Sequence, residues 1–263
     1  HPDQDALESL ARIDWDKDEV VGYVGKFIIS KGVHPILAAL PGLLHQRKDV
    51  KLLLIGFGTY REGLEALIGA LDSGREDLLQ MIGELGYALE VEEKEHPLPH
   101  LLEFWDGLRK KGTFSEYLKK ASSVNLRDRV IFTGILGHEH IRYLLPCTDV
   151  SLVPSIFPEA FGMVSAEALS CGVVPLASYH SGLINILDTV NQETKGRFGD
   201  SLRIDPTPSH MVESIERNVL TVLKQVAPDL AAVKKNCRQI ALDHFSWSAV
   251  CDRFVELPAL VKV

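Results

Sequence analysis

The fold is decided by residues 149–177, DVSLVPSIFPEAFGMVSAEALSCGVVPLA. This stretch opens with the apolar run Val150–Pro154, which has the length and composition of a buried strand, and it closes with a second such run, Val173–Ala177. Between the two runs we expect a helix over about 161–171, which Gly172 ends. Strand, helix and strand together predict a βαβ unit with parallel strands.

Two carboxylates frame this helix, Glu159 in the loop before it and Glu167 within it. Eight helical residues span about 12 Å at 1.5 Å per residue, so the two groups cannot act on one atom, but they could hold two ends of an elongated polar ligand. The backbone N–H groups at the start of a helix favour an anion, and Gly162 would let a ligand approach the backbone closely. These N–H groups belong to Phe161, Gly162, Met163 and Val164. A nucleotide-sugar, with hydroxyls at both ends and phosphate between them, fits this layout.

The same stretch resembles the E-x7-E signature of retaining glycosyltransferases with the GT-B fold, of the family-4 type. The family pattern, PS-x-x-E-x-FG-x4-EA-x3-G-x-P, is matched at Pro154, Ser155, Glu159, Phe161, Gly162, Glu167, Ala168, Gly172 and Pro175. The sequence departs from it by one extra residue ahead of Glu159. The resemblance implies that Glu159 contacts the transferred sugar of a nucleotide-diphospho-sugar, and that Glu167 accepts hydrogen bonds from the ribose hydroxyls.

Two lysines follow the first predicted strand, Val20–Val24, in the loop that begins Gly25-Lys26 and ends Lys31-Gly32. Two ammonium groups in such a loop can approach phosphate oxygens. The block resembles the family's GR-x4-KG segment, whose Arg and Lys grip the donor diphosphate. Lys26 stands in place of the Arg, which keeps the charge but loses the bidentate geometry. The resemblance therefore implies catalytic roles, through positioning and charge, for Lys26, Lys31 and Glu159, and it places Gly25 at the substrate.

Two further loops are expected near the nucleotide base. The strand Val50–Ile55 ends in Gly56-Phe-Gly58, where a plain tight turn is an equally open interpretation. Arg61 stands where the dinucleotide fingerprint has its third glycine, and no strand with an acidic end follows about 20 positions later, which argues against an NAD site. Thr133 to Leu136 resembles the family's F-x-G loop beneath the base. The resemblance thus adds four substrate-binding residues, Gly56, Gly134, Ile135 and Leu136.

Two other segments resemble the family in part. The run from Tyr179 to Asn185 is similar to its GG-x-x-E loop, but it departs at Ser181 and at Asn185, where Glu is usual. His180 in this loop is a candidate base, although a lone loop histidine is more often only solvated. Phe245-Ser-Trp247 is similar to the family's F-S-W, with Ser246 as the N-cap of a last helix.

Alternation of strands and helices predicts an α/β fold, a Rossmann-like three-layer and mostly parallel sheet that forms one lobe of a GT-B fold. Strands are expected near 20–24, 50–55, 130–132, 150–154, 173–177 and 202–204. We interpret residues 1–19 as a leading segment or linker and 20–263 as the nucleotide-sugar-binding domain. Residues of about 72–121 form a helical insertion on it. Trp105 gives this insertion an apolar face, which could dock on the domain, on a partner or on a second copy in an oligomer.

Composition excludes several classes of protein. The formal net charge of −8 over 263 residues argues against nucleic acid or an anionic membrane as the main partner. No apolar run reaches the ~20 residues of a transmembrane segment, and no secretory signal is visible, so we expect a cytoplasmic protein. The 4 cysteines lack metal-ligand spacing, and prolines separate His96 from His100, so we expect neither metal nor cofactor beyond the donor substrate.

The resemblance implies transfer of a sugar from a nucleotide-diphospho-sugar with retention of anomeric configuration. It covers only the donor-binding lobe, so we expect a missing N-terminal acceptor lobe and a piece that is inactive alone; His1 in place of Met agrees with this. A sugar-nucleotide epimerase or a phosphorylase of the same fold remains open, as does a non-catalytic binding or assembly module. A nicotinamide dehydrogenase is the weakest alternative.

Overall fold

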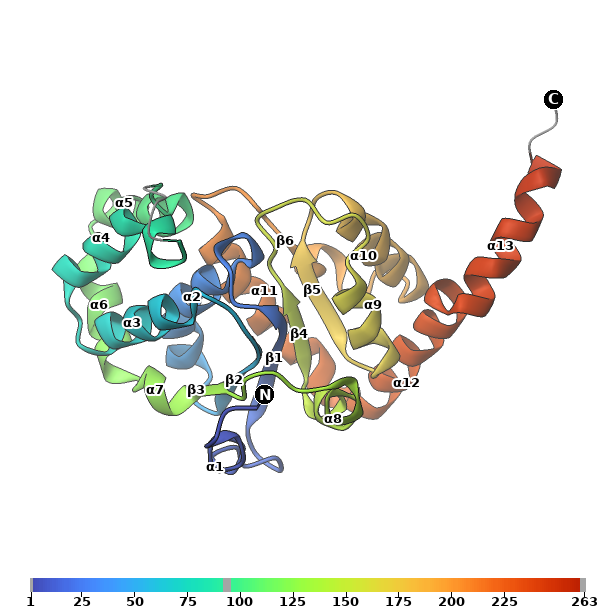
Figure 1. The fold of residues 1–263 in the computed structure, drawn as a ribbon, viewed down its shortest axis with the longest axis horizontal. Coiled ribbons are helices and arrows are strands. Elements are labelled where there is room, and N and C mark those ends of the chain that lie inside the picture. The colour runs from blue at the N-terminus through green and yellow to red at the C-terminus, as the bar shows by residue number, and fades with distance from the viewer. Residues whose placement is uncertain (1, 92–95, 261–263) are drawn as a thin grey trace.

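A computed structural model describes residues 2–91 and 96–260 of the chain. Its centre is a six-stranded parallel sheet with the order β3-β2-β1-β4-β5-β6 (Figure 1). The strands are β1 (Glu19–Lys26), β2 (Val50–Phe57), β3 (Val130–Phe132), β4 (Val150–Val153), β5 (Val174–Ser178) and β6 (Arg203–Ile204). This confirms the predicted Rossmann-like α/β fold. The strand order reverses direction between β1 and β4, and such a switch point opens a crevice at the carboxyl ends of the strands.

Helices join and flank the strands (Figure 1). They are α1 (Ala6–Leu10), α2 (Val33–Gln46), α3 (Arg61–Asp72), α4 (Glu76–Leu85), α5 (Pro99–Lys111), α6 (Phe114–Ser123), α7 (Leu126–Arg129), α8 (His138–Leu144), α9 (Met163–Ser170), α10 (Gly182–Glu193), α11 (Met211–Val226), α12 (Leu230–Ile240) and α13 (Trp247–Leu260). The last of these, α13, extends away from the body. None of the described helices has both the length and the apolar character needed to cross a membrane.

Helix ends differ from the expected ones where the backbone leaves the helical region. Gly86 has φ 51°, so α4 ends at Leu85. Gly162 has φ 87° and holds the left-handed conformation before α9, so this helix begins at Met163 and not at Phe161. The prediction that Ser246 is the N-cap of the last helix, α13, is confirmed, because the N–H of Ala249 donates to Ser246 Oγ at 3.1 Å.

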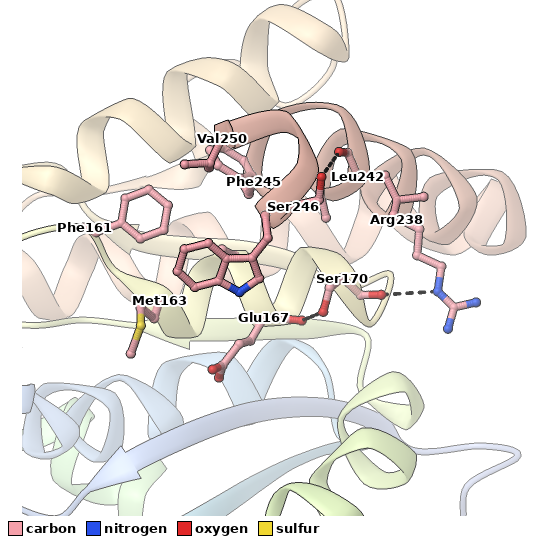
Figure 2. A pocket seen from close by; sticks show the side chains of 12 residues that line it. Phe161, Met163, Glu167, Ser170, Arg238, Leu242, Phe245, Ser246 and Val250 are labelled. Atoms are coloured by element: carbon pink, nitrogen blue, oxygen red, sulfur yellow. Dashed lines mark hydrogen bonds between the residues drawn. The ribbon is translucent and has the colours of Figure 1, made fainter. Parts of the chain in front are cut away.

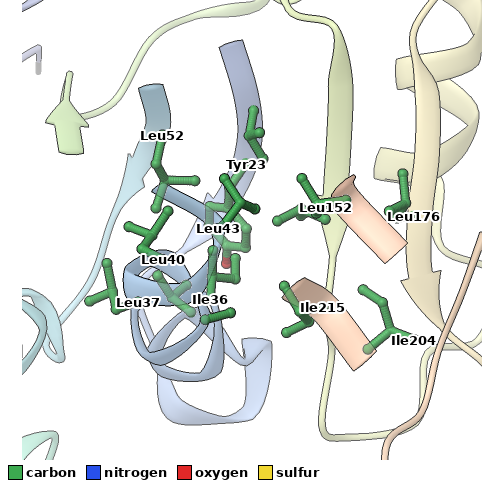
Figure 3. Packing of buried hydrophobic residues seen from close by; sticks show 14 of the residues in the cluster. Tyr23, Ile36, Leu37, Leu40, Leu43, Leu52, Leu152, Leu176, Ile204 and Ile215 are labelled. Atoms are coloured by element: carbon green, nitrogen blue, oxygen red, sulfur yellow. The ribbon is translucent and has the colours of Figure 1, made fainter. Parts of the chain in front are cut away.

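The main core lies between the sheet and the helices α2 and α11 (Figure 3). Alternate residues of each strand point to this side, as Val21 and Tyr23 do in β1. Leucines of α2 and Ile215 of α11 meet strand residues from β1 to β6, including Leu52, Leu152, Leu176 and Ile204. Each fully buried side chain of this kind contributes about 1.5–3 kcal/mol of transfer free energy. The core therefore holds the strand ends, and the loops that leave them, in a fixed arrangement.

The leading segment covers part of the other face of the sheet. Ile13 is buried with Val20, Leu53 and Ile131 in a second, smaller cluster, against which residues of α8 also pack. The backbone N–H of Asp3 donates to Thr133 O at 3.0 Å, beyond the end of β3. Residues 2–18 therefore lie against the same sheet that the later residues form.

The 72–121 segment, in which residues 92–95 lie outside the described part, packs against the domain. Its helix α5 contacts both α4 and α6, and the three helices between them also contact α2, α3 and α11. Trp105, which was expected to give the segment an apolar face, is buried in the main core cluster. Leu101 and Phe104 of the same helix are buried with it, and Leu108 is partly buried beside them. The structure shows this apolar face packed against the domain itself, which is one of the three docking surfaces considered above.

Candidate functional site

The candidate site lies where the loops that follow β1 and β4 meet, at the switch point of the sheet. The N–H groups of Ile156 and Phe157 donate to Ser30 O at 2.9 and 3.2 Å. Gly32 has φ 70°, and a Cβ there would overlap the carbonyl oxygen of Pro154, so only glycine lets the two loops approach this closely. The loops that carry Lys31 and Glu159 are thus held side by side.

Lys31 and Glu159, which are far apart in the sequence, form an ion pair in this crevice. Ser155 Oγ donates a hydrogen bond to the same carboxylate oxygen at 2.6 Å. Burial opposes ionisation of Glu159, but the hydrogen bonds from Lys31 and Ser155 and the charge of Lys31 outweigh it, so its pKa lies below the ordinary value. The side chains of Lys31 and Glu159 remain 35% and 22% exposed, which leaves both within reach of a ligand.

A third loop, after β5, fixes the backbone of Glu159. The N–H of Glu159 donates to Ser181 Oγ at 2.9 Å, and its carbonyl accepts from the N–H of Gly182 at 2.9 Å. His180 Nε2 donates to Ser155 O at 2.7 Å, and His180 Nδ1 lies 2.9 Å from Ser181 Oγ. Both ring nitrogens of His180 are therefore engaged within the protein, and this does not favour His180 as a catalytic base.

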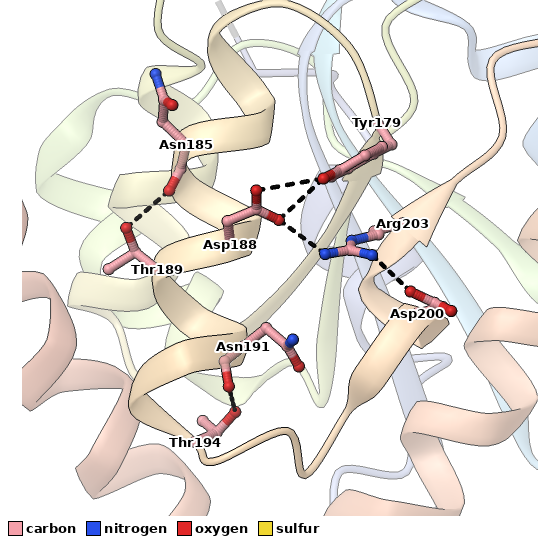
Figure 4. A network of polar contacts seen from close by, with 8 residues as sticks. All are labelled: Tyr179, Asn185, Asp188, Thr189, Asn191, Thr194, Asp200 and Arg203. Carbon is pink, nitrogen blue, oxygen red and sulfur yellow. Dashed lines mark hydrogen bonds and ion pairs between the residues drawn. The ribbon is translucent and has the colours of Figure 1, made fainter.

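This loop is anchored behind the site by a polar network (Figure 4). Asp188 of α10 accepts hydrogen bonds from Tyr179 Oη at 3.1 Å and from Arg203 at 2.9 Å. Arg203 also pairs with Asp200 at 2.6 Å, and its guanidinium lies over the Tyr179 ring, 4.4 Å from the centroid. Asn185, which replaces the glutamate usual in the family, lies outside this network with an exposed side chain.

One cavity of about 400 Å³ gathers seven of the residues predicted to bind or act on the donor. These are Gly25, Lys31, Glu159, Phe161, Gly162, Met163 and Val164. The start of α9 faces this cavity, as the sequence suggested. The structure adds a packing reason for Gly162, because a Cβ there would overlap the side chain of Leu183.

Glu167 lies on α9 beside a second, largely apolar groove of about 510 Å³ (Figure 2). Phe161 and Met163 line both this groove and the first cavity. Trp247, which is 85% exposed, also lines this groove, and the Glu167 carboxylate points away from Phe245 and Val250. Glu159 and Glu167 are therefore separated by the start of α9 and line different hollows, in agreement with the spacing argument.

Three glycines predicted to bind the donor lie at the ends of three neighbouring strands. Gly25 and Gly56 are paired in the register of β1 and β2, and the N–H of Gly56 donates to Gly134 O at 3.0 Å. Asp3 lies against Gly134, where a Cβ would come within 2.6 Å of its backbone nitrogen. The leading segment thus lies over this part of the predicted base site.

Three more of the predicted residues lie outside the cavity at Lys31. Ile135 is at the border of exposure, whereas Leu136 packs on the second core cluster and faces the leading segment and α8. Lys26 is exposed at the end of β1 and forms no ion pair within the described part of the chain. Only Lys31 of the two lysines is therefore built into the crevice.

Sequence reasoning missed the roles of Ser155, Ser181 and Tyr23. Ser155 appeared only as part of a motif, and Ser181 only as a departure from a glycine. Tyr23 lines the cavity and donates its hydroxyl to Lys26 O at 2.8 Å; burial, and then the charge of Glu159, raise its pKa. Across the described residues, no group of three metal-ligating side chains comes together.

Comparison with known proteins agrees with this geometry. Residues 107–200, which include Glu159 and Glu167, match the family model described as "Glycosyl transferases group 1". The 2-deoxystreptamine glucosyltransferase of Streptomyces kanamyceticus is 25% identical over 226 residues, which are 86% of this chain and 41% of that one. Both matches support the glycosyltransferase superfamily.

Solved structures show the same fold. Sucrose-phosphate synthase from Thermosynechococcus elongatus is 26% identical with a TM-score of 0.52, over 99% of this chain and 49% of that one. HepE of Anabaena, solved in complex with UDP, is 18% identical with a TM-score of 0.56, over 98% and 53% of the two chains, and shows the fold alone. The chain therefore spans about half, or less, of the length of these three proteins.

Proposed function

We propose that this chain is the donor-binding part of a glycosyltransferase, which transfers a sugar from a nucleotide-diphospho-sugar with retention of anomeric configuration. The observation that carries the proposal is the meeting of Lys31 and Glu159 in one cavity with the start of α9, at the switch point of the sheet. A cation, a carboxylate and free backbone N–H groups at one place suit a ligand that carries both phosphate and hydroxyls.

Each group has a distinct part in the proposed reaction. Lys31 and the N–H groups at the start of α9 stabilise the negative charge that develops on the leaving diphosphate, as a metal ion does in other enzymes. Glu159 accepts hydrogen bonds from the transferred sugar, and Glu167 accepts them from the ribose. Lys26, which is exposed beside the crevice, adds long-range attraction for the diphosphate.

The acceptor is bound by another part of the protein in this proposal. The chain covers 49% of sucrose-phosphate synthase and 53% of HepE, so half of each of those proteins has no counterpart in it. UDP is the nucleotide named for the HepE complex, and it is the first nucleotide to test here.

Calorimetric titration with UDP, GDP, ADP and NAD, on the wild type and on Lys31→Ala, tests the proposal. We expect one nucleoside diphosphate to bind, and Lys31→Ala to weaken it about 10- to 100-fold, since a hydrogen bond to a charged group contributes about 1.5–3 kcal/mol. Lys48→Ala, at the amino end of β2, is the matched control and should leave the affinity unchanged. Binding of NAD alone, or of none of the four, would contradict the proposed donor site.

A further inference from the structure

Among the described residues of the 72–121 segment, Glu90 is the one whose side chain forms a hydrogen bond with the loop that carries Lys31. Glu90 Oε2 accepts a hydrogen bond from the backbone N–H of Ile29 at 2.6 Å. Ile29 is the first residue of the 3₁₀ turn Ile29–Lys31, whose last residue forms the ion pair with Glu159. The segment therefore contacts the turn at the end opposite to the proposed functional side chain.

This hydrogen bond gives the first N–H group of the turn an acceptor. The first N–H groups of a helical turn have no partner inside it, and a carboxylate is the strongest acceptor that a protein offers them. The other hydrogen bonds of the turn come from its own loop and from the loop after β4, since Lys31 N–H donates to Ile28 O and Ser30 O accepts from Ile156 and Phe157. Within the described residues, Glu90 is the side chain that bonds to the backbone of residues 28–32.

Two further contacts from the same segment lie just after the turn. The ring of His100 in α5 packs edge-on against that of His34, at the start of α2, with centroids 6.2 Å apart. His34 is completely buried, and neither of its ring nitrogens has a hydrogen-bond partner among the described residues. Farther along α2, Tyr117 Oη donates to Ala38 O at 2.9 Å. The segment thus touches the chain at three successive points between Ile29 and Ala38.

We propose that the 72–121 segment braces the Lys31 turn, with Glu90 as the positioning residue, so that the ammonium group of Lys31 is held toward Glu159 and an incoming diphosphate. This inference rests on the proposed donor site for its functional meaning. A lysine side chain loses considerable conformational entropy when it is ordered. A turn that is fixed in advance therefore lowers the entropic cost of binding the ligand.

Amide hydrogen exchange of residues 27–34 tests the brace without any ligand. In Glu90→Ala we expect these amides to exchange about tenfold faster, because a hydrogen bond to a charged group is lost from the turn. Glu90→Gln keeps an acceptor oxygen and should exchange nearly as the wild type does. Glu84→Ala removes an exposed glutamate of α4 whose partner is Gln80, and serves as the matched control. Unchanged exchange in Glu90→Ala would overturn the brace.

UDP affinity supplies the second readout, which a purely structural role of Glu90 would not change. We expect Glu90→Ala to weaken UDP binding about fivefold to tenfold, with Glu90→Gln within about twofold of the wild type. Tighter binding in both variants would mean that Glu90 acts by repelling the phosphates, and would overturn the inference. If the wild type binds none of UDP, GDP and ADP, the donor-site proposal fails, and exchange alone decides whether the brace exists.

Discussion

Glu159 and Glu167 belong to one motif, yet the loop that carries the first and the helix face that carries the second are built differently. The Glu159 carboxylate already accepts hydrogen bonds from Lys31 and Ser155, and its backbone is tied to the loop after β5. Glu167 lies on the exposed face of α9, and its carboxylate has no hydrogen-bond partner among the described residues. One carboxylate is thus held before any ligand arrives, whereas the other must gain its partner from the ligand.

This difference has an electrostatic consequence for a phosphate ligand. Lys31 is paired with Glu159 in the crevice, so a diphosphate has to compete with that carboxylate for the ammonium group. A diol that approaches Glu167 meets no such competitor. If the proposed donor site is correct, we expect Glu159 to lower the affinity for a nucleotide without its sugar, and Glu167 to raise that affinity.

The largest expected effect is a pair of opposite changes in UDP affinity. Glu159→Gln should tighten UDP binding about threefold to tenfold, because it removes a negative charge and frees Lys31. Glu167→Gln should weaken it about tenfold, because a neutral amide is a poorer acceptor for the ribose hydroxyls. Calorimetry at pH 7.5 and low ionic strength measures both.

Glu62→Gln, which removes an exposed carboxylate from the first turn of α3, is the control for a general change in charge. It should leave UDP affinity within about twofold of the wild type, since separated surface charges are screened by salt. If Glu159→Gln and Glu167→Gln both weaken binding, the two carboxylates have the same role toward UDP. The proposed difference between the protein-bonded Glu159 and the exposed Glu167 would then be wrong.

The sequence predicted the βαβ unit well because apolar runs and a glycine stop are local signals. It also predicted that Lys31 and Glu159 lie near a ligand, but this came from resemblance and left their mutual ion pair unseen. That pair depends on how the loops after β1 and β4 approach, which Gly32 and the carbonyl of Pro154 decide. How closely two loops approach depends on the packing of the whole sheet, and it leaves no repeating pattern in the sequence from which it could be predicted.

Two other contacts were beyond local patterns for the same reason. The leading segment is polar and weakly patterned, so nothing in it predicts that Asp3 lies against Gly134. The sequence predicted that the 72–121 segment is helical, but the bond from Glu90 to Ile29 joins residues on different elements. Helix existence is encoded locally, whereas the partner of a polar side chain is decided by the tertiary arrangement.

A smaller effect should appear in stability as a function of pH. The pKa of Glu159 is lowered below 4.5 because bonds from Lys31 and Ser155 outweigh burial, so the unfolded chain binds the proton more readily. The stability that Glu159 contributes is then complete above about pH 4.5 and is lost as pH falls through the folded pKa. We expect Glu159→Gln to lower the free energy of unfolding by about 1 kcal/mol at pH 7, and the difference from the wild type to shrink as pH falls through the folded pKa.

Urea denaturation from pH 7 to pH 3 measures this difference. Repeating it in a Lys31→Ala background completes a double-mutant cycle, in which most of the Glu159→Gln effect should disappear because the partner cation is absent. A difference that grows on acidification would show that the carboxylate is held in its protonated form, the opposite of the expected sign.

The smallest effect concerns the backbone that holds Glu159. Ser181 has φ 51° and ψ −139°, a conformation that is nearly exclusive to glycine, and its Oγ accepts the N–H of Glu159. Ser181→Ala keeps the strain and loses the hydrogen bond, whereas Ser181→Gly loses both. The glycine variant should therefore be more stable than the alanine variant by about 1 kcal/mol, as measured by urea midpoints at equal m-values. Equal stability of the two variants would mean that the backbone relaxes at Ser181, and the position of Glu159 would then rest on Lys31 and Ser155 alone.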